Sequence, residues 1–240
     1  MALFAPDTIE RPSTVRLHAD LYQGTEEWIA ARCGMLTASE MGLILTPTLK
    51  AAKNEKERSH LYELLAQRVT GYVEPRFVSD DMQRGQDDEV EALTLYARHH
   101  APTEACGFIT NDRWGFTLGY SPDALVGTDG LVECKSRRQK YQVETFLVHV
   151  IEGTIPSEYL LQVQTGLLVS ERLWCDLVSY SGGLPLAVIR VHPDQAIQDA
   201  ILSAAGDFEQ RLRDAMGRYR DAVIASRAIP TKRIEREIHL

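Results

Sequence analysis

Residues 121–135 read SPDALVGTDGLVECK and carry two acids and a lysine around a glycine-flanked turn. The second half, Leu131–Lys135, has the character of a strand, whose side chains point in turn to opposite faces. Glu133 and Lys135 therefore share one face. Cys134 points to the other face, where it can be buried as a small apolar residue. The segment predicts a β-strand that presents a carboxylate beside an ammonium group.

A turn precedes this strand. Thr128-Asp129-Gly130 has the composition of a tight turn, because Gly130 can adopt a positive φ at little cost. A hairpin there would bring Asp123 back beside Glu133. Carboxylate oxygens are the ligands that Mg²⁺ prefers, and Lys135 could orient an attacking water or stabilise charge that develops on phosphorus. The grouping therefore predicts a divalent-cation site for phosphodiester hydrolysis.

The same spacing has a purely structural interpretation. A Pro-Asp pair followed at a distance by Glu-x-Lys is a short pattern that arises by chance, and alternating Glu and Lys are common on a solvated strand face. The nuclease interpretation therefore depends on residues elsewhere in the chain.

Composition narrows the class of protein. The chain has 240 residues, of which 44% are hydrophobic and 25% charged, as is typical of a soluble globular protein. The four cysteines show no CxxC spacing, which argues against a disulfide framework or a zinc site and favours a reducing cytoplasm. No apolar stretch approaches membrane-spanning length, so we expect no membrane association. We expect a single nuclease domain over residues 1–240.

The formal net charge of −8 argues against a protein that simply coats DNA. It is compatible with a nuclease, because a metal site needs clustered carboxylates and cations can gather locally. Such a cluster follows the predicted site in the run KSRRQK, residues 135–140. This run could line a path for phosphates, or it could be a solvated loop or helix start.

An N-terminal helix is predicted to begin at Thr25, which has the character of an N-cap and precedes two acids that complement the helix dipole. Trp28 and Arg32 are four residues apart and share one face of this helix. They could be ordinary packing of the arginine stem on the indole. Alternatively, they could form a corner that receives a phosphate and a stacked base.

A second helix start is predicted at Thr37, which pairs with Glu40 in a capping-box pattern. Helix N-termini attract anions, so Arg32 and Ser39 could hold a terminal phosphate together. A structural cap without a ligand is the alternative.

The remaining periodicity predicts further helices over 57–69, 82–100, 142–150, 157–168 and 194–226, and strands over 108–110, 114–119, 173–179 and 186–191. Ser157 is the expected N-cap of the fourth of these helices. Glu89 lies in an acidic cluster that could be a charged helix face or could turn one acid inward as a metal ligand. Gln162 and Gln164 lie in an apolar helix, where a buried amide needs hydrogen-bond partners.

Taken in order, these segments resemble the lambda exonuclease family, also called the YqaJ-type viral recombinases, within the PD-(D/E)xK restriction-endonuclease-like nucleases. The likeness runs from about Tyr22 to Val191 and includes the helical C-terminus. It is carried by five segments: Gln23-Gly24…Trp28…Arg32-x-Gly34…Thr37-Ala38-Ser39, Gly85…Glu89, Ser121-Pro122-Asp123, Glu133-Cys134-Lys135 and Gln162-Val163-Gln164. The resemblance implies an α/β (α+β) fold with a restriction-endonuclease-like core, in which helices flank a mixed central β-sheet.

Matched motif by motif, the resemblance implies roles for nine residues. The metal ligands would be Asp123, Glu133 and Glu89, and the other catalytic residues would be Lys135 and Gln162. The 5′-phosphate pocket, built by the N-terminal helices, would contain Trp28, Arg32, Ser39 and Ser121. The cofactor would be Mg²⁺, with Mn²⁺ as an alternative, at two ions per site.

The resemblance also implies an activity. Family members degrade one strand of linear double-stranded DNA from its 5′ end and leave a 3′ single strand for phage recombination by strand annealing. They can form a ring-shaped homotrimer that encircles DNA, and they pair with a single-strand annealing protein. A phage or prophage protein of this kind would act in the cytoplasm of a bacterial host.

Two other functions fit parts of the sequence. A restriction or repair endonuclease uses the same core, but it would open closed circular DNA, whereas an exonuclease would not. A catalytically silent DNA-binding module is the third alternative. Such a module would have no need to retain Asp123, Glu133 and Lys135 together.

Overall fold

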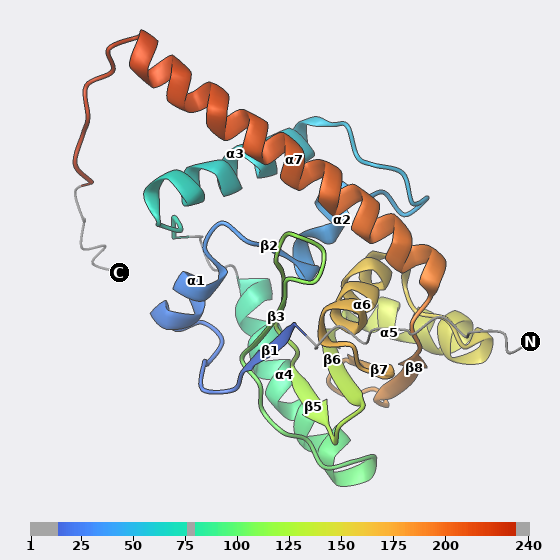
Figure 1. The fold of residues 1–240 in the computed structure, drawn as a ribbon. Coiled ribbons are helices and arrows are strands. Elements are labelled where there is room, and N and C mark those ends of the chain that lie inside the picture. Colours follow the sequence, from blue (N-terminus) through green and yellow to red (C-terminus); the bar gives the residue numbers. More distant parts are fainter. Residues whose placement is uncertain (1–13, 76–79, 234–240) are drawn as a thin grey trace, which may run out of the picture.

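The computed structural model describes residues 14–75 and 80–233. These two ranges contain short strands and helices, with β3 to β6 following one another in the middle of the chain (Figure 1). The strands are β1 (Val15–His18), β2 (Leu36–Thr37), β3 (Phe108–Asn111), β4 (Leu118–Tyr120), β5 (Ala124–Val126), β6 (Gly130–Ser136), β7 (Trp174–Tyr180) and β8 (Ala187–Val191). The helices are α1 (Glu26–Arg32), the 3₁₀ helix η1 (Ala38–Glu40), α2 (Met41–Ile44), α3 (Glu55–Thr70), α4 (Asp80–His99), α5 (Gln139–Glu144), the π-helical segment η2 (Thr145–Val150), α6 (Ser157–Ser170) and α7 (Gln195–Ala225).

The strands form two four-stranded mixed sheets, ordered β1-β3-β4-β2 and β5-β6-β7-β8. In the first sheet β2 runs parallel to β4, and the other pairs are antiparallel. In the second sheet β6 and β7 are parallel, and β5 and β8 add antiparallel at the two edges. Parallel neighbours require a long crossover, which here consists of α5, η2 and α6. The crossover brings α6 back into contact with both sheets.

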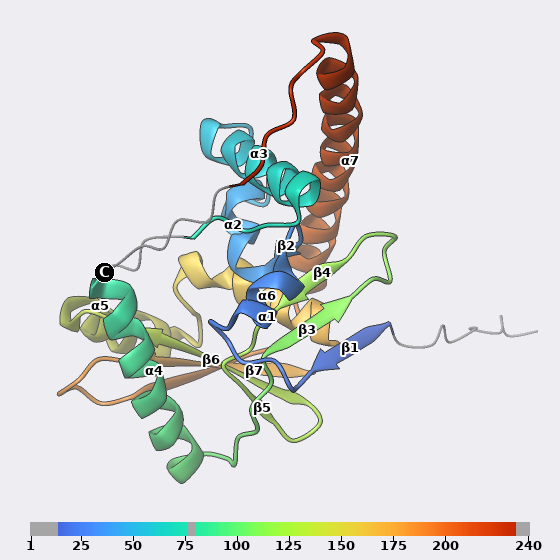
Figure 2. The ribbon, with the colours of Figure 1, turned by 90° about the vertical axis from the view of Figure 1, so that its left-hand side faces the viewer.

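Helices cover both faces of the second sheet (Figure 2). On one face α4 packs against β6 and β7, and Tyr96 joins Val132 and Cys134 in a small core. On the other face α6 lies over the strands and α7 packs on α6, so that a larger core forms around residues such as Leu131 and Phe208. The long helix α7 also runs beside α3 (Figure 1). Strand β6 is thus enclosed between two layers of helices.

The predicted mixed α/β class with flanking helices is confirmed, and its strands are divided between two sheets. Thr25 is the N-cap of α1 and accepts the Trp28 N–H at 3.3 Å, as predicted. The capping box of Thr37 and Glu40 is also present. The prediction of Ser157 as an N-cap is wrong. Pro156 occupies that position with an extended backbone (φ −54°, ψ 132°), and no side chain caps the helix.

Two further features concern membrane-spanning helices and the state of the cysteines. Within residues 14–75 and 80–233, no helix is long and apolar enough to cross a membrane. The four cysteines (Cys33, Cys106, Cys134 and Cys175) are unpaired thiols, as their scattered spacing predicts.

Candidate active site

Successive side chains of β6 point to opposite faces of the sheet, because the residues of a strand alternate. Val132 and Cys134 are buried in the small core under α4, whereas Leu131 belongs to the larger core on the side of α6. Glu133 and Lys135 follow Leu131 on that side, as the sequence predicts. Because β7 pairs with β6 along its whole length, the strand holds these two side chains in a fixed direction.

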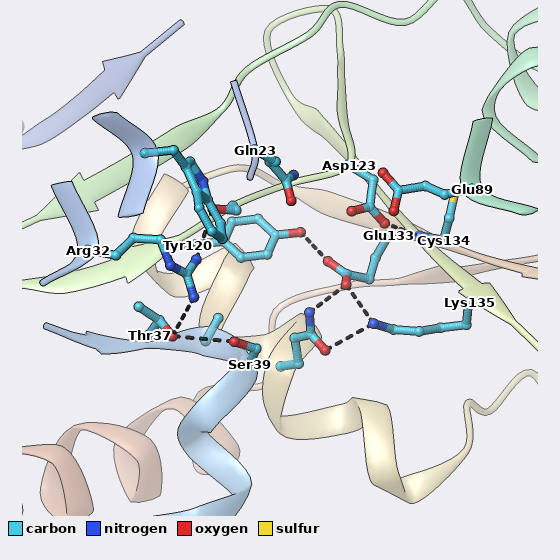
Figure 3. A pocket seen from close by; sticks show the side chains of 14 residues that line it. Gln23, Arg32, Thr37, Ser39, Glu89, Tyr120, Asp123, Glu133, Cys134 and Lys135 are labelled. Carbon is cyan, nitrogen blue, oxygen red and sulfur yellow. Dashed lines mark hydrogen bonds and ion pairs between the residues drawn. The ribbon is translucent and has the colours of Figure 1, made fainter. Parts of the chain in front are cut away.

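The carboxylate of Glu133 is held by three donors (Figure 3). Lys135 Nζ donates to Oε1 at 2.8 Å, and Gln162 Nε2 donates to the same oxygen at 2.5 Å. The Tyr120 hydroxyl donates to Oε2 at 2.8 Å. Lys135 also donates to Gln162 Oε1 at 3.1 Å. Since the donors come from β4, β6 and α6, this 2%-exposed acid ties three elements together.

Asp123 reaches the same region through the predicted hairpin. Strands β5 and β6 pair antiparallel, and the Asp123 N–H donates to the Val132 carbonyl at 3.2 Å. The carboxylate of Asp123 in turn accepts the backbone N–H of Cys134 at 2.5 Å. Figure 3 shows the Glu89 carboxyl, carried by α4, next to that of Asp123, and both residues line the same pocket as Lys135.

The acids of this cluster oppose one another's ionisation. Burial, and then the charges of Glu133 and Glu89, raise the pKa of Asp123 well above its usual range. Burial and the charge of Glu133 likewise raise the pKa of Glu89. Burial acts to lower the pKa of Lys135, but the charges of Glu133 and Asp123 outweigh it and raise this pKa. In the absence of a bound cation, the neighbouring carboxylates therefore favour the protonated form of Lys135.

A second group of polar residues surrounds the guanidinium of Arg32. Its Cζ lies 4.2 Å from the centre of the Trp28 ring, so the two residues, which share one face of α1, are in contact. One Nη atom donates to Ser121 Oγ at 3.0 Å, and the other donates to Thr37 Oγ1 at 3.3 Å. The Ser39 and Thr37 hydroxyls lie 3.3 Å apart. Residues from α1, η1 and the end of β4 thus meet at one arginine.

The hydrogen bonds of the Ser121 hydroxyl determine whether it can donate to a ligand. Its oxygen lies 3.0 Å from Trp28 Nε1 and 3.0 Å from an Arg32 Nη. Both of these groups can only donate, so the Ser121 oxygen accepts twice and its own hydrogen points elsewhere. Trp28 Nε1 is also shared with the Gly107 carbonyl at 3.0 Å. The Ser121 O–H and the Arg32 N–H groups therefore make this end of the site suitable for an anion.

One pocket of about 210 Å³ contains both groups. It brings together all nine residues singled out from the sequence: Trp28, Arg32, Ser39, Glu89, Ser121, Asp123, Glu133, Lys135 and Gln162. Its lining also includes Gln23, Thr37, Ala38, Tyr120 and Cys134, to which no separate site role was assigned. For Thr37 the capping box was a usable signal. For Tyr120 nothing local predicts that its hydroxyl reaches Glu133, because that contact joins two strands of different sheets.

The donors at the acidic end fit a hard divalent cation. They are carboxylate oxygens, and burial followed by the charge of Glu133 raises the pKa of both Asp123 and Glu89, an effect that a bound cation would oppose. Within the described ranges, no group of three or more Asp, Glu, His or Cys side chains is gathered closely enough to hold a metal. Mg²⁺ commonly takes only one or two protein carboxylates and completes its shell with water and substrate phosphate. The pair Asp123 and Glu133 suits that mode.

The basic run at residues 135–140 is not a continuous phosphate path. Arg137 is 7% exposed and donates to Glu158 at 2.7 Å and to the Tyr159 hydroxyl at 3.0 Å. Arg138 and Lys140 are exposed at the start of α5. The central arginine of the run therefore connects β6 to α6, because a buried guanidinium must be paired.

Most of the chain resembles known exonucleases in fold. The crystal structure of the alkaline exonuclease LHK-Exo from Laribacter hongkongensis matches with a TM-score of 0.72 and 31% identity, over 85% of this chain and 100% of that one. The same exonuclease in complex with dAMP matches with a TM-score of 0.68 and the same 31% identity and coverage. A phage-related exonuclease from Haemophilus somnus 129PT matches at 12% identity and a TM-score of 0.52, over 76% of this chain and 96% of that one, which shows the fold alone.

The family is given by the sequence match. No curated protein matches the chain significantly. Residues 27–173, which include both ends of the pocket, match the YqaJ-like viral recombinase domain. Because the match spans more than half of the 240 residues, the chain belongs to the family of YqaJ-like viral recombinase domains.

Proposed function

We propose that the protein is a Mg²⁺-dependent exonuclease that degrades one strand of linear double-stranded DNA from its 5′ end. The observation that carries the proposal is the continuity of one pocket, in which an anion-binding end around Arg32 adjoins an acidic end around Glu133. Family membership and the resemblance to alkaline exonucleases support a phage-type nuclease. The dAMP complex of LHK-Exo adds support, since dAMP is a 5′-mononucleotide such as an exonuclease would release.

In this proposal, one end of the pocket binds the terminal phosphate and the other end holds the cation. Arg32, Ser121 and Ser39 would hold the terminal 5′-phosphate through donated hydrogen bonds, and Trp28 would support the guanidinium from behind. Such an arrangement would direct the next phosphodiester toward the acidic end. The strand would then be shortened from its 5′ end, and the complementary strand would remain as a 3′ overhang.

At the acidic end, Asp123 and Glu133 would hold the cation, with Glu89 as an additional ligand. A bound divalent cation supplies Lewis-acid stabilisation of phosphoryl and leaving oxygens. Lys135 stays protonated and would orient the attacking water and stabilise charge that develops on phosphorus. Gln162 bridges Lys135 and Glu133, so it would fix their relative positions. We predict two ions per site, with Mn²⁺ as the alternative to Mg²⁺.

A time course on end-labelled duplex tests this proposal. The substrates are linear DNA with a 5′-phosphate, linear DNA with a 5′-hydroxyl, and a closed circle, each in Mg²⁺ and in chelator. We expect mononucleotide release from the 5′ end, a preference for the phosphate, and no cleavage of the circle or in chelator. Opening of the circle would instead identify an endonuclease, and binding without any cleavage would identify a silent module.

Substitution of Lys135 tests the division of roles. Because Lys135 would act on developing charge and not on DNA binding, Lys135→Ala should lower single-turnover cleavage by roughly 10²-fold or more, with little change in DNA affinity. Asp123→Ala and Glu133→Ala should abolish cleavage while the fold is kept, as circular dichroism would report. Lys140→Ala, at an exposed position of the same basic run, is the matched control. A Lys135→Ala enzyme with wild-type turnover would contradict the assignment.

The assembly is also proposed from the family resemblance. We expect a ring-shaped homotrimer around the duplex and an interaction with a single-strand annealing protein, in the cytoplasm of a bacterial host. Sedimentation equilibrium tests the trimer, and a monomer at all concentrations would contradict it. Co-purification with an annealing protein encoded beside it would test the partner.

A further inference from the structure

The guanidinium of Arg32 is positioned by a residue that lies behind it. Trp28 supports one face of the group, but its two hydrogen-bonding edges are fixed by Ser121 and Thr37. Thr37 is 1% exposed, and its oxygen accepts the Arg32 N–H at 3.3 Å. The direction of the Thr37 hydroxyl hydrogen therefore decides whether this second edge of Arg32 is held.

That direction is set by Glu40. The Thr37 hydroxyl lies 2.8 Å from Glu40 Oε2, and the Thr37 backbone N–H also donates to this oxygen at 3.3 Å. An ionised carboxylate can only accept, and a hydroxyl has one hydrogen. The hydrogen of Thr37 is therefore committed to Glu40, and the lone pairs of Thr37 face Arg32 and Ser39 (Figure 3). In the Thr37–Ser39 contact Ser39 is therefore the donor, and of the two hydroxyls only that of Ser39 can turn its hydrogen toward a ligand instead.

Glu40 is itself confined. Its side chain is 17% exposed, and its Oε2 lies 4.0 Å from Nε2 of His60 on α3. His60 is 2% exposed and stacks on Phe208 of α7, with 5.7 Å between the ring centres. The carboxylate thus lies between Thr37 in front and a packed aromatic pair behind, which limits the positions that it can adopt.

We propose that Glu40 and Thr37 are positioning residues for recognition of the terminal phosphate. Glu40 orients the Thr37 hydroxyl, and Thr37 then holds the Arg32 guanidinium toward the ligand, although Glu40 itself does not contact the DNA. The inference rests on the proposed function, because it assumes that Arg32 binds a 5′-phosphate. It gives Glu40 a functional role in addition to its structural role in the capping box.

Paired substitutions test the relay. Thr37→Val is nearly isosteric and keeps the backbone N–H bond to Glu40, but it removes the acceptor for Arg32. Thr37→Ser restores the hydroxyl. Glu40→Ala removes the orienting acceptor, and Glu40→Gln keeps an amide oxygen that can accept from Thr37. Thr94→Val, at an exposed position of α4 where the hydroxyl bonds only to its own helix, is the control.

The readout is the ratio of kcat/KM for 5′-phosphorylated duplex to that for 5′-hydroxyl duplex. Loss of one hydrogen bond to a charged group corresponds to a factor of roughly ten. We expect Thr37→Val to reduce the preference by about that factor, mainly through KM, and Glu40→Ala to reduce it in the same direction. Thr37→Ser and Glu40→Gln should keep most of the preference. Anisotropy of the two labelled duplexes in chelator should show the same order without catalysis.

Two results would overturn the inference in different ways. If wild-type enzyme prefers the phosphate and the Thr37→Val and Glu40→Ala variants keep the full preference, or lose both activities by the same factor, the two residues are structural only. If wild-type enzyme shows no preference for a 5′-phosphate, the proposed end recognition fails, and the relay fails with it.

Discussion

At the scale of single residues, the site combines groups that are individually unfavourable in a folded chain. Asp123, Glu89 and Glu133 crowd negative charge, and one lysine offsets only part of it. A buried carboxylate is tolerable only when it is hydrogen-bonded, and Glu133 satisfies this condition with three donors. Asp123 accepts one backbone N–H. Ionisation of Asp123 should therefore destabilise the folded, metal-free protein.

Stability of the metal-free protein should depend on the charge of Asp123. Its folded pKa lies above the unfolded value of about 3.9. The stability linked to this group is therefore fully present below the unfolded pKa and is lost as pH rises through the folded pKa. Asp123→Asn keeps an acceptor for the Cys134 N–H and removes the titration. In chelator at about pH 8, the variant should unfold a few degrees above wild type.

Thermal unfolding across the pH range checks this expectation. The advantage of Asp123→Asn should shrink as the pH falls toward about 5. Asp129→Asn, at an exposed position in the same hairpin, is the control and should show no such trend. An advantage of constant size at every pH would mean that packing, and not ionisation, explains the effect.

Local patterns were sufficient to single out Asp123, Glu133 and Lys135 but not their connections, and the assigned roles of the other candidate residues came from the family resemblance. Asp123, Glu133 and Lys135 follow from a turn signal and strand alternation, and both are properties of neighbouring residues. The bond from Tyr120 to Glu133 could not be predicted, because it depends on how β4 and β6, in separate sheets, are placed beside each other. The burial of Arg137 was missed for the same reason, since its partners lie on α6.

At the scale of elements, α6 is the helix that closes the site, and Gly166 lets it approach β4. A Cβ at Gly166 would lie 2.7 Å from Cζ of Tyr120, inside any normal contact. Tyr120 is 1% exposed and cannot move away without losing Glu133. Gln162 lies one turn before Gly166 on the same face of the helix. The close approach of α6 therefore serves the hydrogen bonds that Tyr120 and Gln162 donate to Glu133.

Gly166→Ala should consequently lower both stability and activity. Overpacking of this kind costs about 1–3 kcal/mol, which exceeds the gain of about 1 kcal/mol from replacing a helical glycine. Denaturant unfolding and single-turnover cleavage measure the two effects. Gly217→Ala in α7, where a Cβ would meet nothing within 4 Å, is the control and should be stabilised. A Gly166→Ala enzyme that is as stable and active as this control would refute the close-approach argument.

The elements themselves were largely predictable, but their assembly was not. Apolar periodicity located the long helices, and Thr25 caps the start of α1 where cap chemistry predicts it. The division into two sheets was not foreseen, because β2 has only two residues and is a strand only through its partner β4. The prediction of one nuclease domain over residues 1–240 stays a prediction.

At the scale of the whole molecule, α7 is attached to the N-terminal half by two ion pairs. Arg68 of α3 donates to both oxygens of Glu209 at 2.9 and 2.6 Å, and Arg211 of α7 donates to both oxygens of Glu57 at 2.7 and 3.2 Å. Arg68 Nε also donates to the Gly34 carbonyl at 2.7 Å. Because Gly34 follows α1, this clamp reaches the segment between Arg32 and Thr37.

Glu209→Ala should therefore destabilise the whole chain while leaving the chemistry intact. The Glu209 side chain is 4% exposed and that of Arg68 is 30% exposed. We expect a loss of about 2 kcal/mol, below the roughly 3–5 kcal/mol for a fully buried pair, and a fall in Tm of about 4–8 °C. A double-mutant cycle with Arg68→Ala isolates the coupling. Asp214→Ala, an exposed acid on α7, is the control, and an equal effect of the two variants would show that the clamp contributes nothing.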